Sequence, residues 1–168
     1  MIEVHDATSE EQLGAVRHLL REFVDWHRRR HAEDRQLIDA YFDQRAFESE
    51  LAGLPGKYAP PKGRLLIANR NGRTAGCAAL REIDRDRCEM KRMFVYPEFH
   101  GKKIGRALAE RLIKEAQAIG YQTMLLDTSF RQIEAMNLYK KMGFKPVQPY
   151  YDLPDELKNW LVFMALEL

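Results

Sequence analysis

The sequence is poor in cysteine and has no long apolar run. Only Cys77 and Cys88 occur among its 168 residues, and neither has histidine or cysteine neighbours at ligand spacing. A disulfide scaffold, a zinc site or any other metal site is therefore not expected. No apolar stretch approaches the roughly 20 residues of a membrane span, and the N-terminus lacks the basic and apolar regions of a secretory signal. We therefore expect a cytoplasmic location and two buried thiols.

An excess of charge of one sign is also lacking. The chain has 27 Lys and Arg against 25 Asp and Glu, a formal net charge of +2, which gives no indication of a nucleic-acid or membrane partner. The one basic cluster, His-Arg-Arg-Arg-His at 27–31, falls at the end of an expected helix, where positive charge suits the helix dipole. No aromatic stacking pattern accompanies it, so a solvated helix end is favoured over a nucleic-acid patch.

What the sequence does contain is the patterning of an α/β protein. Hydrophobic residues make up 45% and charged residues 31%, a globular profile, and the length suits one domain over 1–168. Apolar positions at helical spacing predict helices over 10–27, 36–54, 104–119 and 131–142. Apolar and alternating runs predict strands over 65–68, 74–80, 88–95, 123–128, 144–147 and 160–168. Strand, helix and strand over 88–128 form a predicted βαβ unit with parallel strands.

The third predicted strand, 88–95, carries the residues of most interest, so its two faces matter. Strict alternation places Cys88, Met90, Arg92 and Phe94 on one face and the intervening residues on the other. Before this strand, the segment 53–63 holds three prolines and three glycines. It is predicted to be a loop with restricted dihedral angles rather than a domain linker.

The most informative segment is 95–108, Val-Tyr-Pro-Glu-Phe-His-Gly-Lys-Lys-Ile-Gly-Arg-Ala-Leu. It follows a strand, passes through a glycine-containing turn and opens an amphipathic helix. A helix N-terminus offers free backbone N–H groups to phosphate oxygens, and Lys102, Lys103 and Arg106 add positive charge there. The segment therefore predicts a site for a phosphorylated cofactor.

Three segments together resemble the GNAT superfamily of N-acetyltransferases. They are Glu-Met-Lys-Arg-Met-Phe-Val at 89–95, His-Gly-Lys-Lys-Ile-Gly at 100–105, and Leu-Tyr-Lys-Lys-Met-Gly-Phe at 138–144. The resemblance covers roughly 65–168 and is greatest to small bacterial members of unassigned substrate. It implies a mixed, mostly antiparallel central sheet with a βαβ acetyl-CoA-binding core flanked by helices. It also implies acetyl-CoA as co-substrate, without a metal.

The resemblance further implies which residues bind the cofactor. In the family these lie on the strand before the turn, in the six-residue turn, on the first helical residue and shortly before the Leu-Tyr segment. Here they are Met93, Phe94, Val95, His100, Gly101, Lys102, Lys103, Ile104, Gly105, Arg106 and Gln132. Three positions depart from the family pattern, which usually has Arg or Gln at 100, Gly at 103 and often Asn at 132. Since backbone N–H groups survive a change of side chain, phosphate binding is still expected, provided that Lys103 adopts the dihedral angles of the glycine.

Acetyl transfer to an amine needs a base and an acid. A primary amine has a pKa near that of lysine, about 10.4, so a proton must be removed at neutral pH. Glu89 is the candidate base, directly or through water, and its alternative is an ion pair with Lys91 or a neighbouring arginine. The resemblance makes Tyr139 the candidate proton donor to the departing thiolate, and its alternative is a core tyrosine. A β-bulge near 93–95 would let a backbone N–H polarise the thioester carbonyl. No triad-like arrangement occurs, so we predict direct attack in a ternary complex.

The acceptor is expected between the N-terminal helices and the proline-rich loops. The candidate residues lining it are Tyr58, Tyr150, Tyr151 and Asp152. A small-molecule amine is the predicted acceptor; acids over 33–50 and 152–156 favour a cationic one, although exposed helix charge explains them equally well. Acetylation of a protein amine remains open, as does a non-catalytic acyl-CoA-binding or regulatory module on the same fold. The last strand is compatible with a homodimer.

Overall fold

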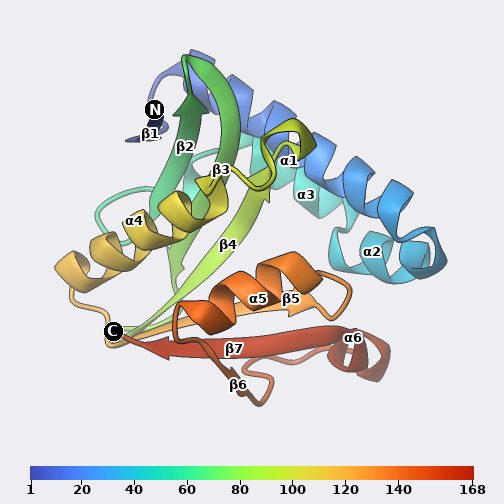
Figure 1. Cartoon of the computed structure of the whole chain (residues 1–168). Coiled ribbons are helices and arrows are strands. Elements are labelled where there is room, and N and C mark those ends of the chain that lie inside the picture. Colours follow the sequence, from blue (N-terminus) through green and yellow to red (C-terminus); the bar gives the residue numbers. More distant parts are fainter.

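The computed structural model describes residues 1–168 and contains one seven-stranded sheet with helices on both faces (Figure 1). The strands are β1 (Ile2–Asp6), β2 (Arg64–Arg70), β3 (Arg73–Glu82), β4 (Arg87–Val95), β5 (Thr123–Ser129), β6 (Lys145–Val147) and β7 (Leu161–Glu167). Their order across the sheet is β1-β2-β3-β4-β5-β7-β6. Only β4 and β5 pair in parallel, and every other neighbouring pair is antiparallel. The mixed, mostly antiparallel sheet and the βαβ unit predicted from the sequence are thus confirmed.

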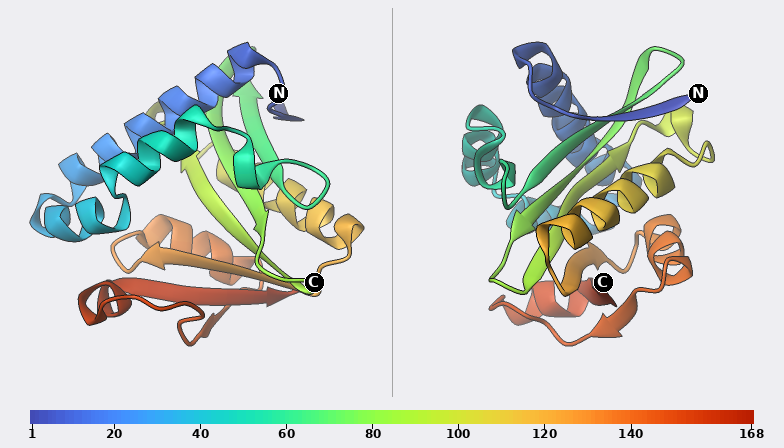
Figure 2. Two further views of the ribbon diagram at one scale, coloured as in Figure 1. Left: turned by 180° about the vertical axis from the view of Figure 1, so that it is seen from behind. Right: turned by 90° about the vertical axis from the view of Figure 1, so that its left-hand side faces the viewer.

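The helices divide between the two faces of the sheet (Figure 2). They are α1 (Glu10–Arg30), α2 (Arg35–Tyr41), α3 (Gln44–Ala52), α4 (Ile104–Ile119), α5 (Ile133–Lys141) and α6 (Asp155–Trp160). On β2, Leu65 and Ile67 pack in one core with α1, α2 and α3, whereas Leu66 and Ala68 pack in the other with α4. This period-two division is what a sheet covered on both sides requires. No helix combines the length and the apolarity that crossing a membrane would need.

The largest differences from the sequence-based prediction are two element boundaries and one additional strand. The single helix expected over 36–54 is two helices, because the Asp43 carboxylate caps α3 by accepting a hydrogen bond from the Ala46 N–H at 2.9 Å. The last strand starts at Leu161, since the residues just before it form the short helix α6. The edge strand β1 was not predicted: it is short, and its burial alternates weakly.

The two faces of β4 are not those that strict alternation predicts. Cys88 and Met90 lie in the core beneath α4, but Phe94 lies in the opposite core, beneath α1. Arg92, between them, has a φ of 58°. The predicted common face for these four residues is therefore wrong.

The cause is an extra residue in β4. Cys77 and Ala79 of β3 pair with Phe94 and Lys91, so two steps along β3 match three along β4. This is a β-bulge, which reverses the faces of the residues that follow it. Gly76 lies at the same place, where a Cβ atom would come within 2.7 Å of the Phe94 carbonyl oxygen. The sequence-based hypothesis was that a bulge near 93–95 would let a backbone N–H polarise the thioester carbonyl. The structure contains a bulge, between Lys91 and Phe94.

β4 and β5 separate just before the bulge. Their parallel pairing covers Arg87 to Glu89 on one strand and Thr123 to Leu125 on the other, and the two strands then diverge (Figure 1). A parallel sheet that opens in this way exposes backbone and inward-facing side chains between its strands. Two cavities described below lie at this opening.

Candidate active site

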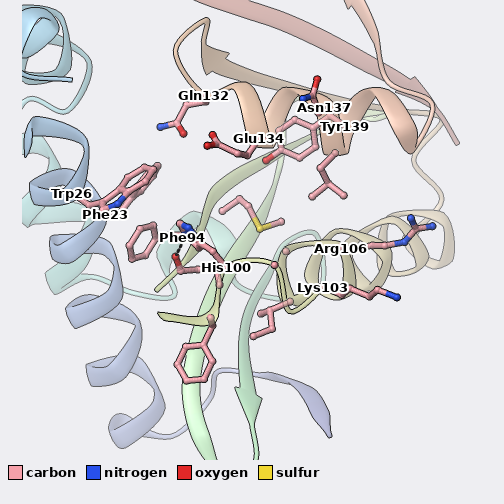
Figure 3. Close-up of a pocket in the computed structure, with 18 of the residues that line it drawn as sticks. Phe23, Trp26, Phe94, His100, Lys103, Arg106, Gln132, Glu134, Asn137 and Tyr139 are labelled. Atoms are coloured by element: carbon pink, nitrogen blue, oxygen red, sulfur yellow. Dashed lines mark hydrogen bonds between the residues drawn. The ribbon is translucent and has the colours of Figure 1, made fainter. Parts of the chain in front are cut away.

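A cavity of about 560 Å³ opens between α1, the turn before α4, and α5 (Figure 3). It is bounded by the end of β4, where the strands diverge. Of the residues predicted to bind the cofactor, all but Lys102 line it: Met93, Phe94, Val95, His100, Gly101, Lys103, Ile104, Gly105, Arg106 and Gln132. The predicted acid, Tyr139, lines it too. The structure thus brings together residues from β4, the turn, α4 and α5 around one space.

The turn presents unpaired backbone donors to this cavity. Gly101 and Lys103 both have positive φ, 76° and 65°, so Lys103 adopts the left-handed conformation that the family assigns to glycine. Within the turn, only the N–H groups of His100 and Lys102 donate to backbone carbonyls, those of Pro97 and Phe99. The donors left free belong to Gly101, Lys103, Ile104, Gly105 and Arg106. Free N–H groups at a helix N-terminus with nearby cations suit a diphosphate.

Replacing Lys103 by glycine is expected to stabilise the fold and weaken cofactor binding. A left-handed conformation strains a residue with a Cβ atom, so glycine should add about 0.5–1 kcal/mol to the free energy of unfolding. Loss of the ammonium group should raise the Kd of acetyl-CoA by about 3–10-fold at low salt. Urea unfolding and calorimetric titration check the two effects. Lys102→Gln, outside the cavity, is the control, and equal weakening by both variants would contradict a role for position 103.

A cation and an acid from distant segments close one side of the cavity. Arg30, at the end of α1, stacks on Trp26 with 5.0 Å between the guanidinium carbon and the ring centroid, and it forms an ion pair with Glu134 in the first turn of α5. The hydrogen bond from Arg30 lowers the pKa of Glu134. His100 lies edge-on to Trp26, and its ring Nε2 is 2.9 Å from the Val95 carbonyl oxygen. These contacts tie α1 to the turn and to α5.

The basic cluster at 27–31 is only partly a solvated helix end. Arg29 and Arg30 are exposed at the end of α1, and the arginines pair with acids, among them Asp39 and Glu134. His27 and His31 are only 4% and 8% exposed. The prediction of a solvated end therefore holds for these arginines and is wrong for the two histidines, which are buried. The Gln132 amide nitrogen lies 3.2 Å from His27 Nδ1.

Burial of His27 should make stability depend on pH. Desolvation, followed by the charges of His31 and Arg30, lowers the pKa of His27 to about 4, below its usual value of about 6.5. Between these pH values the unfolded chain binds the extra proton, so stability falls as the pH is lowered through this window. His27→Phe should remove about 2 kcal/mol of the loss between pH 7.5 and pH 5. Urea unfolding of both proteins at the two pH values tests this, and parallel losses would contradict it.

Tyr139 stands where two cavities meet. It is buried in α5 and lines both the large cavity and a small one of about 80 Å³ between the ends of β4 and β5. Its hydroxyl makes no hydrogen bond within the chain and points into the large cavity (Figure 3). Burial, followed by the charge of Asp127, raises the pKa of Tyr139 well above its ordinary value. The hydroxyl therefore stays protonated at neutral pH.

Glu89 is placed away from that junction. Its side chain is 1% exposed, Arg81 Nε donates to one carboxylate oxygen at 2.7 Å, and the Tyr150 hydroxyl donates to the other. Lys91 Nζ lies 3.9 Å away. Glu89 lines neither cavity beside Tyr139 but a separate one of about 210 Å³. The ion pair, the alternative interpretation, is present, and the role of Glu89 as a base stays a prediction.

The carboxylate that does line the small cavity beside Tyr139 is that of Asp127. It accepts hydrogen bonds from the hydroxyls of Tyr41 and Tyr151, and Lys91 Nζ lies 3.3 Å from the Tyr41 hydroxyl. Burial lowers the pKa of Lys91, against the charges of Asp127 and Glu89. Sequence reasoning missed Asp127, although an acid inside the apolar run Thr-Met-Leu-Leu-Asp-Thr was a signal.

The predicted acceptor residues lie in different places. Tyr150 and Tyr151 join the carboxylate network through Glu89 and Asp127. Tyr58 is fully buried and lines a third cavity, of about 470 Å³, beside α3. Asp152 is exposed and lines none of these cavities.

Comparison with known proteins identifies the class of protein to which this fold and this cavity belong. Residues 20–144 match the Acetyltransferase (GNAT) family. The chain is 40% identical over 123 residues to an uncharacterised N-acetyltransferase of Schizosaccharomyces pombe, covering 72% of this chain and 74% of that one. It is also 40% identical over 107 residues to an IAA acetyltransferase of Azospirillum brasilense, covering 61% and 69%.

Solved structures show the same fold. The PaiA N-acetyltransferase of Thermoplasma acidophilum, in complex with coenzyme A, superimposes with a TM-score of 0.73 at 20% identity, over 100% of this chain and 99% of that one. The chain belongs to the GNAT family of N-acetyltransferases. It is an enzyme with acyl-CoA as co-substrate, and the non-catalytic alternative loses its support.

Proposed function

We propose that the protein transfers the acetyl group of acetyl-CoA to a primary amine of a small molecule, by direct attack in a ternary complex. The observation that carries the proposal is the position of Tyr139, whose free hydroxyl stands where the large cavity meets the small one. The large cavity has the free N–H groups of the turn at one end and apolar walls such as Met93 and Leu138 elsewhere. This combination suits a molecule with a diphosphate and a long, less polar arm.

In the proposed reaction, the amine nitrogen attacks the thioester carbonyl carbon from the small cavity. A C–N bond forms, the carbonyl oxygen takes the negative charge, and a backbone N–H beside the bulge near Met93 stabilises it. The C–S bond then breaks, and the thiolate leaving group takes the proton of the Tyr139 hydroxyl. At neutral pH the Tyr139 hydroxyl is protonated and is therefore in the form that donates. The proton that leaves the amine restores the Tyr139 hydroxyl through solvent at the end of the cycle. The products are the N-acetyl amine and coenzyme A, and the enzyme is unchanged.

The amine must also lose a proton, and two carboxylates are candidates for receiving it. Asp127 lines the small cavity, so we assign direct contact with the amine to Asp127. Glu89 lies at the other side of Lys91, with both its oxygens engaged by Arg81 and Tyr150. In the proposal the Glu89 carboxylate stabilises the charged form of Lys91. The Lys91 ammonium group in turn positions the Tyr41 hydroxyl, which donates to Asp127. The sequence-based assignment of Glu89 as the base competes with this one.

Turnover with added amines tests the proposed reaction. Acetyl-CoA incubated with a panel of small primary amines should release coenzyme A thiol in proportion to N-acetyl product. Tyr139→Phe should lower kcat by about 100-fold while the Kd of acetyl-CoA is unchanged, because phenylalanine keeps the packing and removes the proton. Acetylation of protein amines alone would overturn the small-molecule assignment, and an unchanged kcat in Tyr139→Phe would overturn its role as acid.

The proposal treats residues 1–168 as one N-acetyltransferase domain. Both hydrophobic cores share the single sheet, and the large cavity takes residues from α1 as well as from β4, α4 and α5. Neither half of the chain forms the site by itself.

A further inference from the structure

The third cavity, of about 470 Å³, has a feature that the reaction does not use. It lies between α3, the loop that follows it and the bulged residue Arg92. It shares the walls Tyr41, Phe42 and Arg92 with the small cavity that holds Tyr139 and Asp127. The third cavity is therefore a direct neighbour of the cavity at the proposed point of attack.

The wall of this cavity carries more hydrogen-bond donors than the protein uses. Arg92 is held between Phe42 and Phe47, each ring centroid 5.3 Å from its guanidinium carbon. Its Nε and Nη2 donate to the two oxygens of Glu50 at 2.8 and 3.1 Å. A guanidinium has five N–H groups, so three remain without an acceptor in the chain. The hydroxyl of Tyr58, which is fully buried, also has no partner.

The charges of the wall are balanced. Burial alone would raise the pKa of Glu50, but the hydrogen bonds and charge of Arg92, together with Lys57, hold it at about 2. Glu50 is thus ionised, and it is shared by two cations, since Lys57 Nζ lies 3.1 Å from it. Lys57 and the other acid of the lining, Asp43, are both exposed, and Asp43 caps α3. The wall therefore has two cations and two acids, and its unused hydrogen-bond donors, rather than a net charge, distinguish it.

Two of the acids over 33–50 that favoured a cationic acceptor are paired elsewhere. Asp39 pairs with Arg28 at 2.7 Å and Glu48 with Arg21 at 2.9 Å, and none of these four residues lines the third cavity. Two others, Asp43 and Glu50, do line it, but Glu50 is engaged by Arg92 and Lys57, and Asp43 caps α3. A group that only accepts hydrogen bonds fits the unused donors of Arg92 and Tyr58, and a carboxylate forms the strongest bonds of this kind.

We propose that the acceptor carries a carboxylate, which binds Arg92 and the Tyr58 hydroxyl in the third cavity while its amino group meets Asp127 in the small one. The acceptor is thus an amino acid or a close analogue rather than a simple amine or a polyamine. The inference rests on the proposed function and narrows its substrate class. Planar guanidinium groups bind carboxylates through two parallel hydrogen bonds, which supplies the orientation that the attack needs.

Matched pairs of acceptors test the inference. Each amino acid is compared with its carboxamide, which keeps the size and removes the charge, and a diamine represents the polyamines. For the preferred amino acid, kcat/KM should exceed that of the carboxamide by about 100-fold, the effect of lost charge-assisted hydrogen bonds. Equal values for the pair, or a diamine as the best acceptor, would overturn the inference while leaving the proposed function standing.

Binding separates this inference from the proposed function. In the presence of coenzyme A, the N-acetyl amino acid should raise the melting temperature and its N-acetyl carboxamide should not. If no amine is acetylated but this difference is found, the acceptor reaction fails and the carboxylate site stands. Equal shifts for the two compounds would remove the carboxylate site.

Variants of Arg92 and Tyr58 test whether these two residues bind the carboxylate of the acceptor. Arg92→Gln alone would leave the buried Glu50 carboxylate without its main cation and would destabilise the fold. The double variant Arg92→Gln/Glu50→Gln removes both charges and is used instead. It should raise KM for the amino acid by about 100-fold and abolish the preference over the carboxamide. Tyr58→Phe should raise the same KM by about 3–10-fold. Arg45→Gln, exposed on α3 outside the cavity, is the control. A preference preserved in the double variant would overturn the assignment.

Discussion

Replacing Asp127 by asparagine is expected to lower kcat by about 1,000-fold, within the range for removal of a general base. The carboxamide oxygen can still accept a hydrogen bond from Tyr41 or Tyr151, so the side chain keeps its place, but it cannot receive the proton of the attacking amine. Asp127 lines the small cavity and not the large one. The Kd of acetyl-CoA should therefore be unchanged. Steady-state kinetics and calorimetric titration of the same preparation measure the two quantities.

The comparison that decides the base is with Glu89→Gln. If Asp127 receives the proton, Glu89→Gln should have the smaller effect on kcat, since Glu89 acts only through Lys91. The exposed acid Asp86, replaced by asparagine, is the matched control for surface charge. A full loss of activity in Glu89→Gln, with a melting temperature near that of the wild type and a nearly normal Asp127→Asn, would show that Glu89 is the base.

The cofactor half of the site was predictable because it is local in sequence. The turn and the two elements that flank it, β4 and α4, form one continuous segment, 87–119. Backbone N–H groups at a helix N-terminus follow from helix geometry alone. The left-handed conformation of Lys103 was stated as a condition, and the structure meets it. The parallel pair of β4 and β5 also follows from the order strand, helix, strand.

The acceptor half was not predictable in the same way. The bulge at Arg92 adds one residue to β4, and no period-two pattern reveals which residue is added. Glu50 and Arg92 are 42 positions apart, and Tyr41 and Asp127 are 86 apart. Such contacts depend on how α2 and α3 pack against β4 and β5. Charge and periodicity in single segments carry no information about that packing.

Replacing Gly105 by valine should raise the Kd of acetyl-CoA by at least about 100-fold, with little change in stability. A Cβ atom at this position would lie 3.6 Å from Leu138 Cδ2 and 3.9 Å from Val95 Cγ2, both ordinary contacts, and both residues line the large cavity. The chain itself thus tolerates a Cβ atom here. Within a helix, valine costs slightly less than glycine. The added atoms fill the space next to the free N–H groups of the turn, where close approach of a phosphate needs bare backbone.

The same substitution at Gly14 is the control, because its Cβ position in α1 is open and lies outside the cavity. Titration with acetyl-CoA and thermal unfolding of both variants separate binding from stability. If Gly105→Val binds acetyl-CoA as the wild type does, the diphosphate does not lie on the turn, and the lysines there have another purpose. If it loses several degrees in melting temperature, the glycine serves the packing of α4 against α5 rather than the cofactor. Only weak binding with an unchanged melting temperature agrees with a glycine that is required by the ligand.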